Sequence, residues 1–432
     1  MMSDTTKQIA PLRLVLEGQF WDSHIYMGKL YLFTLDGRVH TVEWDRLVSE
    51  FALPTELALP MQYAFSRSDY LYDNQRDLTF QDPQVREVIQ TKFVRLAKHH
   101  EVPRAADWRY YLLNTRDTPF PFPHIDATIY MKGFFSVCET GVFVSSISEL
   151  ESKSKSNSNS KSKSKRGKKG KVLKLWDCPV ISVDASYGAL ALAAGPEGLF
   201  EFELDDWVSG DPRQAKPINK RDCTDCSWAY YSIVGSSHKQ GSIFAEYAAV
   251  TDHHDNRNGS KTKIKNGKDF EPTNLGRSWR EAPKVQRQFE KTFAVEEIFD
   301  QKGYCWGGMD KICQASDGVM TVAQYSPWED DAAKRFRVLR RITFDSGKGT
   351  PVCGAVAPFG SIIELDRRIV VVRSDDEIFM IPGLPVNWRV FNRSKQYENQ
   401  LHVIYENRLE IYSFNHDYFV DQKEKCSGSL KR

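Results

Sequence analysis

Cys223 and Cys226 are the one pair of cysteines in the chain with CxxC spacing. Thiolates at this spacing hold structural zinc or exchange disulfides. A zinc site needs two further ligands, and the nearest histidines, His238, His253 and His254, lack the spacing of a second pair. A redox motif is expected where a strand enters a helix, whereas this segment has a β-type pattern. We expect two ordinary thiols near a turn, with a metal at Cys223 and Cys226 as the weaker alternative and no cofactor.

Histidines and carboxylates occur together at two other places. His99-His100-Glu101 stands at the end of a predicted helix, where an imidazole is favourable beside the negative helix end, and it is not an HExxH motif. Residues 252–255 read DHHD in a polar loop, where neighbouring side chains do not readily point at one ion. The chain also lacks GxSxG, GxxxxGK[ST] and a GxGxxG between a strand and a helix. We therefore predict no catalytic residue.

A basic tract at residues 152–171 is the strongest charge signal. It holds nine Lys or Arg and no acidic residue. Because the net charge of the whole chain is +2, the remaining residues carry a net charge of −7. Its Ser, Lys and Asn composition cannot bury apolar surface, and we predict a disordered linker. Contact with nucleic-acid phosphates is an alternative, through Lys163, Lys165, Arg166, Lys168 and Lys169. The acidic remainder, and a tract without aromatics for base stacking, argue against it.

Aromatic residues gather between positions 108 and 123. Alternating Pro and Phe at 119–123 cannot form a ladder strand, and exposed aromatics beside Arg are typical of binding hot spots. Packing over a neighbouring helix explains the same cluster equally well. The predicted partner-binding residues are Trp108, Arg109, Tyr110, Tyr111, Phe120 and Phe122.

Elements able to position these residues are mostly β-strands. Seven times an apolar run meets a turn residue pair and continues as a second apolar run, which is the pattern of a β-hairpin. The turns are Asp36-Gly37, Thr140-Gly141, Glu197-Gly198, Gln240-Gly241, Asp317-Gly318, Asp375-Asp376 and Glu406-Asn407. Many of the runs are apolar on both faces, as expected of strands inside packed sheets.

The order of residues repeats. Residues 125–144 and 182–202 both read apolar-Asp-Ala, Gly, strand, x-Gly, strand, with Asp126 and Asp184 in the same place. Corrected for insertions, the turns recur about every 35 to 45 residues, the length of a four-stranded blade. The chain thus resembles the β-propeller repeat superfamily, WD40-like or YVTN-like in the broad sense, although Trp44-Asp45 is its one suitably placed WD pair.

That resemblance implies an all-β, seven-bladed propeller over residues 12–420, and the alternative is two β-sandwich domains separated near 152–171. Residues 12–16 would complete the last blade beside residues 409–414 and remove an exposed edge. We predict a helical insertion at 80–103, where Asp82-Pro83 begins a helix, a polar loop insertion at 251–285 and a flexible tail at 421–432.

Composition limits the function. At 41% hydrophobic residues, without an 18-residue apolar run or an N-terminal secretory pattern, the protein is expected to be cytoplasmic and to contact no membrane. Eight scattered cysteines fit reduced thiols. We predict a non-enzymatic scaffold that binds another protein, within a multi-subunit complex. The alternatives are a nucleic-acid-associated subunit and an enzyme at the mouth of the propeller channel, for which Asp126, Asp184 and Asp310 are candidate lining residues.

Overall fold

The structure is a computed structural model. It describes residues 10–50, 55–72, 82–98, 107–151, 172–204, 215–251, 285–329, 331–344, 349–374 and 376–415. Two compact units make up the chain. Unit 1 is Met1–Pro123, Ser145–Val172 and Ala357–Arg432, and unit 2 is His124–Val144 and Leu173–Val356.

The strands form seven four-stranded antiparallel sheets, so the fold is a seven-bladed β-propeller, as predicted, and not two β-sandwiches. The first strands of the sheets are β2 (Phe20–Tyr26), β6 (Asp126–Tyr130), β10 (Ser182–Ser186), β14 (Asp225–Ala229), β18 (Tyr304–Gly308), β22 (Pro351–Ala357) and β26 (Asn387–Val390). The second strands are β3 (Lys29–Thr34), β7 (Gly133–Cys138), β11 (Ala189–Ala193), β15 (Ser232–Ser237), β19 (Lys311–Ser316), β23 (Gly360–Leu365) and β27 (Gln400–Tyr405).

The outer half of each sheet follows the same order. The third strands are β4 (Arg38–Glu43), β8 (Gly141–Ser146), β12 (Leu199–Glu203), β16 (Gly241–Thr251), β20 (Val319–Tyr325), β24 (Arg368–Arg373) and β28 (Arg408–Ser413). The fourth strands are β5 (Leu112–Asp117), β9 (Leu173–Trp176), β13 (Lys216–Asn219), β17 (Val285–Ala294), β21 (Phe336–Thr343), β25 (Ile378–Pro382) and β1 (Leu12–Glu17). In unit 2 the first strands β6, β10, β14 and β18 contact one another in that order, so they are the inner strands.

The part of the chain that the structure describes contains eight helices, one of them a 3-10 turn, and most of them are short. They are α1 (Trp44–Ser49), α2 (Thr55–Phe65), α3 (Asp69–Tyr72), α5 (Pro83–Lys98), the 3-10 turn η1 (Trp108–Tyr111), α6 (Ile147–Glu151), α7 (Glu296–Phe299) and α8 (Ala332–Arg335). The backbone N–H of Gln84 donates to Asp82 Oδ1 at 2.8 Å, so Asp82 caps α5 and Pro83 occupies its first turn. Ile89, Phe93 and Leu96 of α5 are buried in the core of unit 1.

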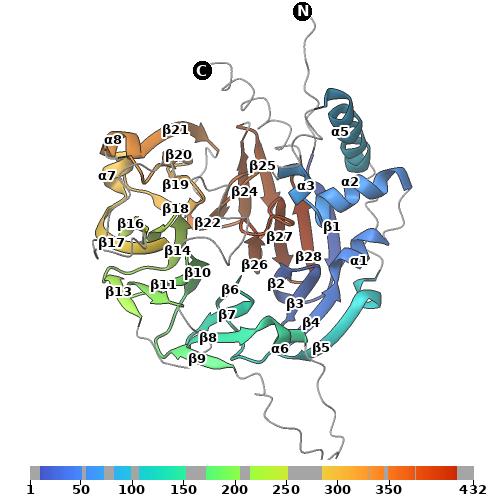
Figure 1. Cartoon of the computed structure of the whole chain (residues 1–432), viewed down its shortest axis with the longest axis horizontal. Helices are drawn as coiled ribbons and strands as arrows, with labels where there is room; N and C mark the ends of the chain where they lie inside the picture. The colour runs from blue at the N-terminus through green and yellow to red at the C-terminus, as the bar shows by residue number, and fades with distance from the viewer. Residues whose placement is uncertain are drawn as a thin grey trace, which may run out of the picture. The chain divides into compact units, whose positions relative to one another are not determined.

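The last blade joins the two ends of the described chain. β1 pairs with β28 in antiparallel register from Leu12 opposite Ser413 to Glu17 opposite Arg408, as predicted for residues 12–16. Figure 1 shows β1 in blue lying beside β28 in red. Because an early strand completes the sheet made by the last three, this blade ties the N-terminal segment to the C-terminal one.

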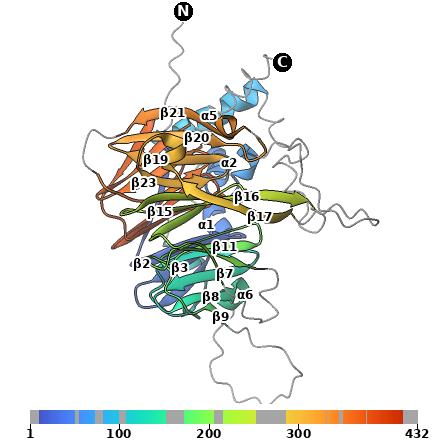
Figure 2. The ribbon, with the colours of Figure 1, turned by 90° about the vertical axis from the view of Figure 1, so that its left-hand side faces the viewer.

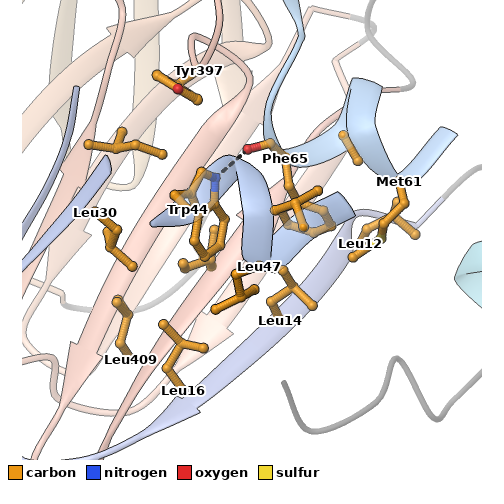
Figure 3. Close-up of a cluster of buried hydrophobic side chains, with 14 of the residues drawn as sticks. Leu12, Leu14, Leu16, Leu30, Trp44, Leu47, Met61, Phe65, Tyr397 and Leu409 are labelled. Atoms are coloured by element: carbon orange, nitrogen blue, oxygen red, sulfur yellow. Dashed lines mark hydrogen bonds between the residues drawn. The ribbon is translucent and has the colours of Figure 1, made fainter. Parts of the chain in front are cut away.

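A single apolar core connects that blade with the helices of unit 1. Trp44 is fully buried, and its indole Nε1 donates to the carbonyl of Phe65 at 2.6 Å (Figure 3). Leu12, Leu14 and Leu409 lie in the same cluster. Trp44 is the first residue of α1, so the Trp44-Asp45 pair anchors a helix to the sheets instead of ending a strand.

A buried polar network crosses from β2 to the last blade. Asp22 is fully buried and accepts hydrogen bonds from Arg389 Nε at 2.5 Å and Nη2 at 2.7 Å. His24 Nε2 lies 3.1 Å from the same carboxylate. Ser23 Oγ lies 3.1 Å from His402 Nδ1, and burial lowers the pKa of His402 to about 3. A neutral imidazole, a paired carboxylate and an inaccessible hydroxyl make this network structural.

Candidate partner-binding site

Five first strands return into their second strands through two-residue turns with an unusual residue at the first position. The turns are Met27-Gly28, Met131-Lys132, Tyr187-Gly188, Tyr230-Tyr231 and Met309-Asp310. In each, the first residue has a left-handed backbone, with φ values of 47°, 48°, 48°, 46° and 52° in that order.

Such turns normally carry Asn, Asp or Gly at this position, because a bulky side chain in the left-handed region costs about 1–2 kcal/mol. Here the position holds Met or Tyr in all five blades. Tyr187 and Tyr230 pack partly against the core of unit 2, whereas the methionines at the other three turns are exposed. The departure from turn chemistry at the methionines therefore marks a surface kept for another purpose. The side chain of Met27, at the unit 1 turn, is 71% exposed.

In unit 2 the four other turns contact one another. The N–H of Gly188 donates to the hydroxyl of Tyr130, next to Met131, at 2.9 Å. The rings of Tyr187 and Tyr231 lie 6.2 Å apart, edge to face. The N–H of Tyr230 donates to the carbonyl of Met309 at 2.7 Å.

Trp328 extends this group beyond the turns, with its ring 5.4 Å from that of Tyr230. We call Met131, Tyr187, Tyr230, Met309 and Trp328 the hairpin-tip surface. Met131 is 52% exposed, Met309 49% and Trp328 37%, and both tyrosines are partly exposed.

The chemistry of the hairpin-tip surface suits a protein partner. Methionine adapts to irregular apolar contacts, and Tyr and Trp are the commonest hot-spot residues. Burial, and then the nearby Asp310, raise the pKa of Tyr230, so its hydroxyl stays protonated and able to donate. Of the charged turn residues, Lys132 is exposed and Asp310 is partly exposed.

A chain of hydrogen bonds along the inner strands holds these hairpins together. Ser182 Oγ lies 3.3 Å from Asp126 Oδ2 and 3.0 Å from Asp225 Oδ1. The hydroxyl of Tyr304 donates to Asp225 Oδ2 at 2.5 Å. The four side chains of this chain of hydrogen bonds belong to four successive first strands, and each lies four residues before the end of its strand. They are Asp126, Ser182, Asp225 and Tyr304.

Asp225 is the titratable centre of that chain. Desolvation raises its pKa to about 6, and the hydrogen bonds from Tyr304 and Ser182 oppose the shift. The N–H of Cys226 also donates to its Oδ1, at 2.8 Å. These contacts satisfy a buried carboxylate, and they activate no nucleophile.

Asp126 and Asp184, predicted as candidate lining residues, do lie on inner strands. Each accepts a hydrogen bond from the N–H of the residue that follows it, at 2.7 Å and 2.9 Å. Their registers differ, because Asp184 lies two residues nearer its turn than Asp126, and Ser182 is the residue equivalent to Asp126. Asp310, the third predicted residue, belongs to the Met309 turn.

A buried arginine supports the Tyr187 tip from below. The guanidinium of Arg287 lies 4.5 Å from the ring centre of Trp228 and 4.7 Å from that of Tyr247, and it pairs with Glu201. Tyr187 packs on the same Trp228 at 6.2 Å. Arg287 belongs to β17, which with β16 forms the long two-stranded ribbon seen in Figure 2. The arginine therefore fixes this ribbon against the neighbouring blade.

The two cysteines of the CxxC pair are buried beneath the sheets. Cys226 Sγ lies 3.3 Å from the carbonyl of Ala191, and Cys223 Sγ lies 3.2 Å from that of Asp225. Burial, and then the Asp225 charge, raise the pKa of Cys223 to about 12 and that of Cys226 well above its usual range. Thiols that resist ionisation are poor metal ligands and poor nucleophiles. In the part of the chain that the structure describes, no group of three or more His, Cys, Asp or Glu side chains could hold a metal ion.

The predicted partner-binding residues divide between core and surface. Trp108 is buried, donates from Nε1 to the carbonyl of Glu17 at 3.0 Å and packs 5.8 Å from Phe20. Phe120 is buried 5.9 Å from Phe33.

The other four reach the surface to different degrees. Tyr110 is 83% exposed, Arg109 pairs with Asp107 at 2.9 Å, and Tyr111 and Phe122 are partly buried. Leu112 and Leu113, which the sequence pattern did not single out, are exposed beside Tyr110.

Several predicted residues lie outside the described part of the chain. These are the basic tract with Lys163, Lys165, Arg166, Lys168 and Lys169, the pair His99-His100 with Glu101, and residues 252–255. Among the helices described, none is long and apolar enough to cross a membrane.

Comparison with known proteins finds similarity in structure alone. No protein-family model and no curated protein matches the chain. A crystal structure of the WD40 β-propeller domain of Doa1 matches at 11% identity and a TM-score of 0.32, covering 67% of this chain and 92% of that one. Two COPII coat structures match at 8% identity and a TM-score of 0.40. The first, an outer coat vertex on membranes, covers 70% of this chain and 72% of that one. The second, the coat assembled on membranes, covers 70% of this chain and 40% of that one.

The seven four-stranded sheets, the last of which is completed by the first strand of the chain, define the class of fold. The chain is a seven-bladed β-propeller protein, without assignment to a specific family.

Proposed function

We propose that this protein is a non-enzymatic interaction module and that its hairpin-tip surface binds another protein within a multi-subunit assembly. The observation that carries the proposal is the row of Met and Tyr side chains held in left-handed turns on four successive blades, where both methionines are exposed and both tyrosines are partly exposed. Glycine or asparagine would make the same turns at lower cost. The exposed methionines therefore serve contact with something outside the fold, and the partly exposed tyrosines add to the same surface.

The arrangement favours a partner with a complementary apolar face. The turns are joined by hydrogen bonds and ring contacts within unit 2, so the surface is organised before binding. Preorganised aromatic side chains lose little conformational entropy on binding. We include Arg109, Tyr110, Tyr111 and Phe122 as a separate contact region on unit 1, with Trp108 and Phe120 supporting it from the core.

Cytoplasmic localisation is part of this proposal. None of the seven cysteines that the structure describes is paired in a disulfide, which supports a reducing compartment.

The test is comparative capture followed by titration. The full chain, a Met131→Gly/Met309→Gly variant and a Val338→Ala control serve as baits in a lysate of the source organism. Proteins retained by the wild type and the control but lost with the double variant are then purified and titrated. We expect a loss of affinity of tenfold or more, about 1.4 kcal/mol, for two hot-spot side chains. Equal binding to the double variant would refute the proposed surface.

A further inference from the structure

The fourth strands are sheet edges, and one of them differs from the rest. Edge strands of natural proteins are usually protected by charged side chains, because their free backbone groups can pair with another strand. Six of the seven fourth strands carry at least one charged residue, whereas β25 reads Ile-Phe-Met-Ile-Pro. β25 is thus an edge without electrostatic protection.

The register of β25 shows which backbone groups are free to pair. Just beyond the two ends of β25, the N–H of Arg373 donates to the carbonyl of Glu377 at 2.9 Å and the N–H of Gly383 donates to the carbonyl of Arg367 at 3.0 Å. Residues 377 and 383 are therefore hydrogen-bonded to their partners on the β24 side, in the register of the β24–β25 pair. Antiparallel pairs alternate between bonded and non-bonded residues. The N–H and C=O groups of Ile378 and Met380 therefore point away from β24, towards the open edge.

The side chains of the same residues form an exposed apolar strip. Ile378 is 36% exposed and Met380 48%, and Leu384, just after the strand, is 67% exposed. Phe379 faces the other way and packs 5.9 Å from Tyr412. β25 is consequently anchored on one face and apolar on the other.

We propose that β25 pairs with β25 of a second copy of this chain, antiparallel across a two-fold axis. Placing Ile378 of one copy opposite Met380 of the other forms four backbone hydrogen bonds and leaves none of these eight groups unpaired. The pairing joins two blades into one eight-stranded sheet.

Charge favours a second copy in this orientation. The exposed Asp376 and Glu377 precede β25, and the exposed Arg367 lies beside its end at Gly383. Antiparallel pairing brings the acidic start of each strand towards the basic end of the other. β21 is unsuited to the same pairing, because its Arg337, Arg340 and Arg341 would meet like charges.

A five-residue edge buries a small interface, so the dimer is weak and concentration-dependent, with a dissociation constant on the order of micromolar. Sedimentation velocity of the full chain from about 1 to 200 µM is expected to show mass rising from the 49.7 kDa monomer towards twice that value. Met380→Lys, which places two cations across the axis, and Met380→Pro, which removes the edge N–H, should each keep the protein monomeric. Leu339→Lys, on the exposed β21 edge, is the matched control and should leave the dimer intact.

Hydrogen exchange provides a second measurement on the same samples. The amides of Ile378 and Met380 should become protected as concentration rises. A wild type that stays monomeric throughout, or a dimer that survives both Met380 substitutions, would overturn the proposal. Protection independent of concentration would do so too, because it would show the edge covered by a segment of the same chain. Thermal melting identifies any variant that fails to fold, and Met380→Lys at a half-exposed side chain is expected to fold normally.

Discussion

Replacing Met309 by glycine and by alanine separates the cost of the turn from the value of its side chain. Met309 has φ 52°, a conformation that glycine adopts without strain and alanine does not. Both substitutions delete the same side chain, which is 49% exposed. The two variants differ by one methyl group, and at an exposed position its main effect is on backbone energetics.

The magnitude follows from two opposing terms. Relief of left-handed strain favours glycine by about 1–2 kcal/mol, and the entropy that glycine loses on folding opposes it by about 0.5–1 kcal/mol. We expect the glycine variant to be more stable than the alanine variant by roughly 0.5–1 kcal/mol. At Val338, an exposed strand residue of β21, the order should reverse, with alanine better by about 0.5–1 kcal/mol.

Urea unfolding of the four variants, followed by tryptophan fluorescence, measures both differences. An alanine variant at 309 as stable as the glycine one would refute the argument that these turns are strained. Partner binding gives the complementary result, because both variants lack the methionine and should lose affinity equally. Equal loss of binding with unequal stability is the signature of a side chain kept for contact.

Three further predictions follow from charged groups. The pKa of Asp225 is raised to about 6 from 3.8, so its contribution to folding stability is most favourable below about pH 4 and is lost as the pH rises through about 6. Asp225→Asn should remove up to about 3 kcal/mol of this pH dependence. The difference in Tm between pH 4.5 and pH 7 should then be smaller in the variant than in the wild type. Arg389→Met leaves the buried Asp22 carboxylate without its main partner and should lower the free energy of unfolding by about 3–5 kcal/mol, measured by chemical denaturation. Adding Asp22→Asn should recover most of this loss. An unchanged denaturant midpoint for Arg389→Met would show the ion pair to be dispensable. Deletion of residues 152–171 should abolish whatever salt-sensitive affinity the chain has for DNA or RNA, measured by fluorescence anisotropy at two salt concentrations, and retained binding would exclude the tract.

Much of the architecture follows from turns that obey ordinary rules. Each of the seven predicted turns lies in a different sheet, and six of them join a second strand to a third. Five of these turns contain a glycine with positive φ, and this requirement for glycine made the turns predictable from the sequence. The glycines are Gly37, Gly141, Gly198, Gly241 and Gly318. The pairing of residues 12–16 with β28 was also predictable, because an unpartnered apolar strand at one end fits an incomplete blade at the other.

The hairpin-tip surface escaped prediction for the opposite reason. Its turns carry Met or Tyr where the turn rules expect Asn or Gly, so the chain around Met131 or Tyr230 lacks the Asn-Gly or Asp-Gly pair that marks a hairpin turn. Aromatic composition alone could not separate Trp108, which is buried, from Tyr110, which is not, because burial depends on contacts with Glu17 and Phe20 far along the chain.

The pairing of β1 with β28 has a consequence during synthesis. Roughly 390 residues separate the two strands, and at about 5–20 residues per second the ribosome needs about 20 to 80 s to make them. Throughout that interval the apolar Leu12, Leu14 and Leu16 have no sheet to join. The nascent chain is therefore exposed to mispairing until its last blade emerges, and its folding yield should depend on chaperones that shield this first strand.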